Sequence, residues 1–159
     1  MSKTSTREQV ATDTSKEYNN SILFLGHTLL RASEDMIETL EENQVNIQNM
    51  MTSKFIGHFL DDISSWQKTL SIVDQVISLW FDVQRTWSHL ESIFVGSEDI
   101  RLQLPNDSQR FDETNQKFQK KIKLMSKIPN VIKATAIPGL AEELEVILVD
   151  NFTLFLFKR

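Results

Sequence analysis

The side chains that could support chemistry in this chain are three histidines, a group of lysines and three tryptophans; there is no cysteine. His27, His58 and His89 lie far apart, and none has a second histidine four residues away, the helical spacing that lets two ligands share one zinc ion. Without a thiol, the chain has no disulfide framework, thiolate zinc site or cysteine nucleophile. These residues are typical of surface or interface positions, and we predict no metal site.

Phosphate chemistry is also unsupported by the sequence. The four glycines are too widely spaced for a phosphate-binding loop, and no Gly-Lys-Ser or Gly-Lys-Thr triplet occurs. The carboxylates belong to charged helical faces, so no acid or base role can be assigned to them. We therefore predict that the chain is not an enzyme and binds no cofactor.

The lysines form one cluster, which has two interpretations. Its members are Lys117, Lys120, Lys121, Lys123 and Lys127. The simpler interpretation is a solvated helix face opposite the apolar side chains of the same segment. The alternative is a docking surface for an acidic partner, formed by the first four of these lysines.

The tryptophans belong to a long apolar stripe with helical spacing. The stripe consists of Phe59, Ile63, Trp66, Leu70, Val73, Ile77, Trp80, Trp87 and Phe94, and only Gln84 and Glu91 interrupt its steps of three and four. No proline or glycine falls between Phe59 and Val95, and Gly96 suits the left-handed position that ends many helices. The pattern predicts one central helix over about residues 55–95. At about 60 Å it would make the molecule elongated.

Shorter helices are predicted on both sides of the central one, so the fold class is an all-α elongated bundle. They cover residues 34–51, 108–127 and a last segment beginning at Pro138, with a turn at 104–107 and a half-helix at 131–135. Apolar residues at 22–25 and 29–30 are also assigned to helix, although Gly26 interrupts them. Residues 1–20 are polar and without periodicity, so we expect a disordered extension. The expected packing residues are Trp66, Trp80, Trp87, Leu90, Phe94, Phe111 and Phe118, with an exposed docking surface as the alternative for the tryptophans.

Charge and hydropathy limit the partners. The net charge of −5 disfavours nucleic acid and tight binding to the acidic face of a microtubule. No signal peptide opens the chain, so we expect an intracellular protein. The apolar run at 144–157 contains Glu145 and Asp150 and is too short to span a membrane. An apolar edge prone to association is the better interpretation of that run.

Several motifs resemble the start of the linker region of dynein heavy chains. The resemblance begins in residues 37–44 and 51–54 and continues at Trp66-Gln67-Lys68. It is closest around Trp80, Val83-Gln84, Trp87 and 90–94, and then continues at 97–100, 103–105, Phe111 and 138–140. It covers roughly residues 27–148, and the sequence of residues 83–99 resembles the axonemal, outer-arm type.

The resemblance implies a piece of a minus-end-directed microtubule motor, located in the axoneme of a cilium or flagellum as part of the cytoskeleton. In that family the linker is a helical rod that arches over a ring of AAA+ modules and works as a mechanical lever. The implied partners are that ring and other dynein chains, with the microtubule touched only indirectly. Residues 149–159 depart from the family pattern and are expected to form a divergent apolar tail that leaves the last helix without a partner. A free-standing helical scaffold or adaptor, binding partner helices through its aromatic stripe, remains the alternative.

Overall fold

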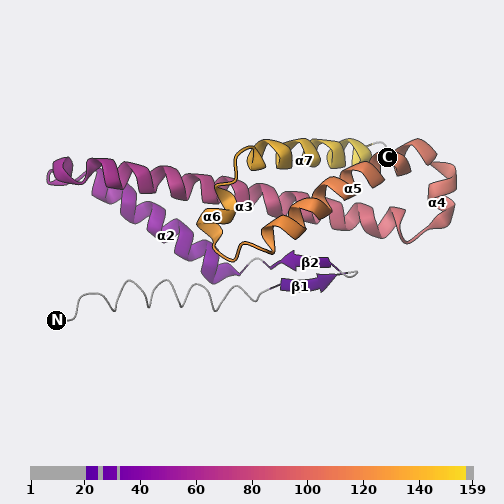
Figure 1. The fold of residues 1–159 in the computed structure, drawn as a ribbon, viewed down its shortest axis with the longest axis horizontal. Helices are drawn as coiled ribbons and strands as arrows, with labels where there is room; N and C mark the ends of the chain where they lie inside the picture. The colour runs from indigo at the N-terminus through magenta and orange to yellow at the C-terminus, as the bar shows by residue number, and fades with distance from the viewer. Residues whose placement is uncertain (1–20, 25–26, 32, 157–159) are drawn as a thin grey trace.

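The computed structural model describes residues 21–24, 27–31 and 33–156 and shows an elongated molecule built along one helix (Figure 1). The predicted extension at 1–20 lies outside the described residues. The elements, in chain order, are β1 (Ser21–Phe24), β2 (His27–Leu30), α2 (Glu34–Met51), the 3-10 turn η2 (Ile56–His58), α3 (Leu60–Phe94), α4 (Glu98–Gln103), α5 (Pro105–Met125), α6 (Val131–Thr135) and α7 (Leu140–Leu156). The predicted elongated helical architecture is confirmed for the body of the molecule.

The central helix α3 has 35 residues and is therefore about 52 Å long. It begins five residues later than predicted, because η2 occupies the segment around Gly57 and Phe59 serves as the N-cap. It ends at Phe94 as expected, but Gly96 does not have the positive φ that the sequence suggested. A side chain there is excluded by proximity instead, since a Cβ on Gly96 would lie 2.5 Å from the carbonyl oxygen of Ser92.

The two halves of α3 have different surroundings. Helices α5, α6 and α7 gather on the C-terminal half, whereas α2 is the one helix of the described residues that runs beside the N-terminal half (Figure 1). We call residues 34–72, which comprise α2, η2 and the start of α3, the arm. No residue of the arm is buried, whereas the core begins at Val73.

The first apolar segment is a β-hairpin rather than the predicted helix. Strand β1 pairs antiparallel with β2, with Ser21 opposite Leu30 and Phe24 opposite His27. Four-residue apolar runs are too short to nucleate a stable helix, and isoleucine and phenylalanine favour extended backbone. This two-stranded sheet is the exception to an otherwise helical structure in the described residues.

Two helix boundaries near the prolines also differ from the prediction. Pro105 was assigned to a turn, but it occupies the first turn of α5, where its missing N–H costs nothing. The segment before it forms the short helix α4, whose N-cap Ser97 accepts a hydrogen bond from the N–H of Ile100 at 3.4 Å. Pro138 does not open the last helix, since Gly139 takes a φ of 76° and α7 begins at Leu140.

The last helix runs through the predicted boundary at residue 148. Residues 149–156 continue α7, and Asn151 and Leu154 are buried against the core. The expectation that the last helix lacks a partner is therefore wrong, because every third or fourth side chain of α7 is buried against the core. None of the described helices has the length and apolar character needed to cross a membrane.

Candidate functional site

An aromatic cluster lies between α3 and α5. Phe118 packs against both Trp80 and Trp87, with ring centroids 5.2 and 5.3 Å apart. Phe94 stacks on Phe111 at 5.1 Å with an angle of 17° between the ring planes. All five rings are buried, and such pairs contribute about 0.5–1.5 kcal/mol each beyond the area they bury. The cluster holds two antiparallel helices together along several turns.

The polar residues that interrupt the apolar stripes serve this cluster. The indole N–H of Trp80 donates to Oε1 of Gln84 at 3.2 Å, and the indole N–H of Trp87 donates to Oδ1 of Asn115 at 3.0 Å. Buried indole groups need such acceptors, since an unpaired N–H is costly. Gln84 was noted in the sequence only as an interruption of the stripe, and the roles of both polar residues were missed there.

Gln84 also attaches the hairpin to the long helix. Its Oε1 accepts from the N–H of Leu30 at 3.0 Å, and its Nε2 donates to the carbonyl of Leu30 at 2.7 Å. The neighbouring Leu29 is buried in the core. One glutamine therefore joins segments 54 positions apart and orients an indole as well.

A carboxylate lies within the same buried face of α3. Glu91 falls between Trp87 and Phe94 and is 4% exposed. Burial raises the pKa of its carboxyl above the ordinary value of 4.5. Charge at this position opposes folding unless neighbouring groups compensate for it.

Helix α7 packs against α3 beside α5. The side-chain amide of Asn151 donates to the hydroxyl of Thr86 at 3.1 Å, and the rings of His89 and Phe155 lie 5.4 Å apart. These two contacts follow the same order along both helices, so α7 runs parallel to α3. The central helix is therefore supported by a second helix along its buried half.

The guanidinium of Arg101 binds the C-terminal end of α3. Arg101 forms a two-pronged ion pair with Asp112 of α5, with nitrogen–oxygen distances of 2.7 and 3.1 Å. Its Nε also donates to the carbonyl of Phe94 at 2.7 Å. The hydrogen bonds to Asp112 raise the pKa of the guanidinium, which stays charged. One side chain thus connects the C-terminus of α3 with α4 and α5.

The predicted lysine cluster does not form one free surface. Lys117 pairs with Asp150 at 3.5 Å, and Lys121 pairs with Glu143, so both side chains join α5 to α7. Lys120 and Lys123 are exposed on α5. Two of the four proposed docking residues therefore have intramolecular partners.

The structure places six of the seven predicted packing residues in the core and one outside it. Trp80, Trp87, Leu90, Phe94, Phe111 and Phe118 are at most 2% exposed. Trp66, in contrast, is 53% exposed, so its assignment as a core residue is wrong for this chain. The spacing of a stripe identifies a helix face, but it does not say how far along that face the neighbouring helices extend.

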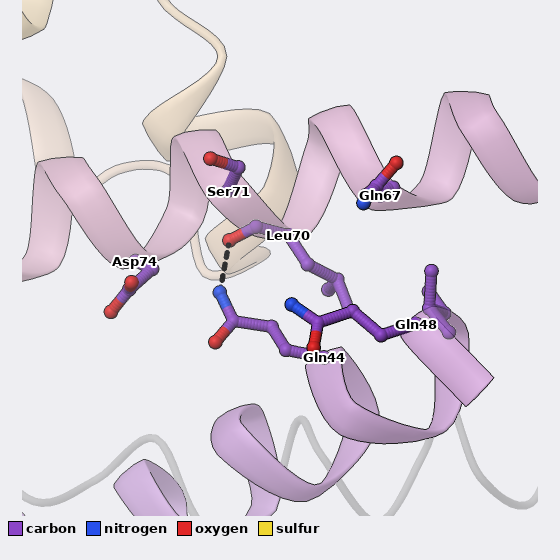
Figure 2. A pocket seen from close by; sticks show the side chains of 7 residues that line it. Gln44, Gln48, Gln67, Leu70, Ser71 and Asp74 are labelled. Carbon is purple, nitrogen blue, oxygen red and sulfur yellow. Dashed lines mark hydrogen bonds between the residues drawn. The ribbon is translucent and has the colours of Figure 1, made fainter. Parts of the chain in front are cut away.

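A polar groove of about 290 Å³ lies between α2 and α3 (Figure 2). Its walls are mainly amide and hydroxyl side chains, and Nε2 of Gln44 donates to the carbonyl of Leu70 at 3.4 Å (Figure 2). Asp74 supplies the one carboxylate of the lining. No group of three or more potential metal ligands occurs among the described residues. The groove is therefore a polar contact between two helices.

The fold and its aromatic cluster define a helical packing module built on a single long helix. The chain matches the family model described as "Dynein heavy chain, N-terminal region 2" over residues 4–150. It therefore belongs to the dynein heavy chain family, and the resemblance found in its motifs is confirmed.

Named relatives agree with this assignment. The chain is 58% identical over 122 residues, 77% of its length, to dynein axonemal heavy chain 17 of Homo sapiens. It has the same identity and coverage to the ciliary dynein beta chain of the sea urchin Tripneustes gratilla. Over 125 residues, 74% of the chain, it is 41% identical to the dynein-1-alpha heavy chain of the flagellar inner arm I1 complex of Chlamydomonas reinhardtii. In each case the chain spans about 3% of the relative's length.

Proposed function

We propose that this chain is a non-catalytic segment of the mechanical linker of an axonemal dynein heavy chain, with residues 27–148 as the linker-like region. The observation that carries the proposal is the continuous helix α3, about 52 Å long, whose C-terminal half is locked by interleaved rings. A lever must transmit a displacement without absorbing it. Closely packed side chains resist bending because any bend has to separate rings that are in contact.

The supports around α3 are suited to this role. Phe118 bridges two tryptophans one heptad apart, and Arg101 closes the end of the helix against α5. Helix α7 runs along a further side through the Asn151–Thr86 hydrogen bond. Bending of this half would therefore disturb contacts on more than one side at once.

The names of the relatives support the location and partners that we propose. They include the words axonemal, ciliary and flagellar. On this basis we propose that the parent protein works in the axoneme of a cilium or flagellum; the outer-arm type is proposed from the resemblance of residues 83–99. The partners of this segment would be the AAA+ ring of the same heavy chain and other dynein chains, with the microtubule reached only through the rest of the motor.

The lever role can be tested in the full-length heavy chain by substituting Trp87→Ala. Loss of the ring contact and of the indole hydrogen bond loosens α3 against α5. We expect slower microtubule gliding with nucleotide binding retained. Leu102→Ala, at a position that is 80% exposed, is the control and should glide at the wild-type speed. Wild-type speed in the Trp87 variant would contradict the lever role.

A further inference from the structure

One row of side chains on α3 continues past the end of the core. Its members stand seven residues apart and are Phe59, Trp66, Val73, Trp80, Trp87 and Phe94. The last four are buried, whereas Phe59 is 56% and Trp66 is 53% exposed. In a straight helix such a row drifts by about 20° per heptad, so Trp66 is turned by about 40° from Trp80 and Phe59 by about 60°, and both still belong to the same broad apolar side of α3.

The covered part of the row shows what kind of element fits it. Helix α5 lies over Trp80, Trp87 and Phe94 through its own phenylalanines. The second half of α5 is basic outside this apolar face and carries Lys117, Lys120, Lys121 and Lys123. It ends at Met125, and the chain then turns into α6 (Figure 1). Phe59 and Trp66 therefore lie beyond the part of the row that is buried.

The only described element beside the N-terminal half of α3 is α2, and it contacts a different side. Gln44 of α2 meets the backbone of Leu70, and the groove there is lined by Gln67 and Ser71. Trp66 takes no part in that lining. At the tip, Phe55 is 76% exposed, with the Lys54 ammonium 5.0 Å from its ring centroid. An aromatic surface therefore extends from the tip of the arm toward the core.

The arm that carries these rings is negatively charged as a whole. The arm contains seven carboxylates and two lysines, so it carries by itself a formal charge of −5, equal to that of the whole chain. Asp61 and Asp62 directly follow Phe59 and Leu60. No lysine or arginine occurs in α2. A partner that covers the rings would need positive side chains at its margins.

We propose that Phe59 and Trp66, with Phe55 at the tip, bind an amphipathic helix whose apolar face is bordered by lysine or arginine. That helix would lie end to end with α5 on the same row of α3. We assign it to a part of the heavy chain outside these 159 residues, since the chain spans about 3% of its relatives' length. This assignment rests on the proposed linker function.

The experiment uses the 159-residue chain and overlapping synthetic peptides of about 25 residues, or about seven helical turns. The peptides tile human dynein axonemal heavy chain 17, and binding is followed by the fluorescence anisotropy of labelled peptides. We expect one or a few basic amphipathic peptides to bind. Binding should weaken with added salt and should protect tryptophan fluorescence from acrylamide, because Trp66 is the exposed member of the three.

Matched variants locate the binding surface. Phe59→Ser and Trp66→Ser should each weaken binding by at least about tenfold, as expected for aromatic anchors. Ile72→Ser is the control, because Ile72 is also exposed but lies about 120° around α3 from Trp66. Circular dichroism should show unchanged helix content in all three. Because these side chains are exposed, loss of folding is not expected to obscure the result.

Three outcomes would overturn the proposal: no peptide binds, the serine variants bind as well as wild type, or the chain forms dimers that Trp66→Ser abolishes. The last outcome would assign the surface to a second copy of the chain. Failure here would leave the lever role intact if Trp87→Ala still slows gliding. If the peptides bind but Trp87→Ala glides normally, the lever role fails and the docking surface stands.

Discussion

The side chain of Gln84 holds both backbone polar groups of Leu30, accepting from its N–H at 3.0 Å and donating to its carbonyl at 2.7 Å. This pair of hydrogen bonds has the geometry of one step of a β-ladder, with a side-chain amide in place of a neighbouring strand. It joins the hairpin to α3 at the level of Trp80, whose indole shares the same Oε1 acceptor.

The first prediction concerns this glutamine. Gln84→Ala should lower the free energy of unfolding by about 1–3 kcal/mol, because it leaves partly buried groups of Leu30 and Trp80 without a partner. Urea unfolding measures the change, and the amide proton of Leu30 should exchange faster with solvent. Gln67→Ala, an exposed position on the same helix, is the matched control and should unfold like wild type. Unchanged exchange at Leu30 would argue against the attachment.

The second prediction separates two tryptophans that look alike in sequence. Trp87→Ala should lower the free energy of unfolding by about 3–5 kcal/mol, since it opens a cavity in a fully buried site. Trp66→Ala should change it by no more than about 0.5 kcal/mol, as is usual at exposed positions. If Trp87→Ala does not fold, Trp87→Phe still tests the hydrogen bond to Asn115. Equal effects at the two positions would contradict the described core.

The third prediction concerns pH. Because burial raises the pKa of Glu91 above 4.5, the folded chain holds this proton more tightly than the unfolded chain does. The stability contributed by protonated Glu91 is present below pH 4.5 and is lost as pH rises through the folded pKa. Glu91→Gln cannot lose it, so the unfolding free energy of wild type should fall relative to the variant over that window.

Urea unfolding of both proteins at a series of pH values measures this difference. Glu41→Gln, at an exposed position on α2, controls for the general loss of one negative charge. Parallel stability curves for wild type and Glu91→Gln would show that burial of this carboxylate has no energetic consequence.

The fourth prediction addresses the end of α7. Leu154→Ala should cost about 2–5 kcal/mol, because Leu154 is 3% exposed and belongs to the core cluster. Leu156→Ala, on the same helix but 66% exposed, should be nearly neutral. The structure also predicts that α7 resists limited proteolysis until the whole chain unfolds, because its buried side chains pack against the core. Rapid cutting within 140–156 of the native chain would contradict the packing of α7.

Much of this structure could be predicted from the sequence because helical periodicity is a local property. The steps of three and four from Phe59 to Phe94 identified α3 and its inner face, and the motifs around Trp80 and Trp87 identified the family. Short segments were less predictable. The paired strands at 21–24 and 27–30 carry too few residues to show a period, and Pro105 is compatible with both a turn and a helix start.

Tertiary structure alone decided what each position on the stripe does. Trp66 and Trp87 have the same residue type, the same helix and nearly the same face, yet one is exposed and the other is fully buried. The difference comes from where α5 ends, which depends on contacts between residues distant in sequence. The same holds for Gln84, Asn115 and Asn151, whose hydrogen-bond partners lie 54, 28 and 65 positions away. A local pattern determines a helix and its apolar side, whereas burial depends on which other segments reach that side.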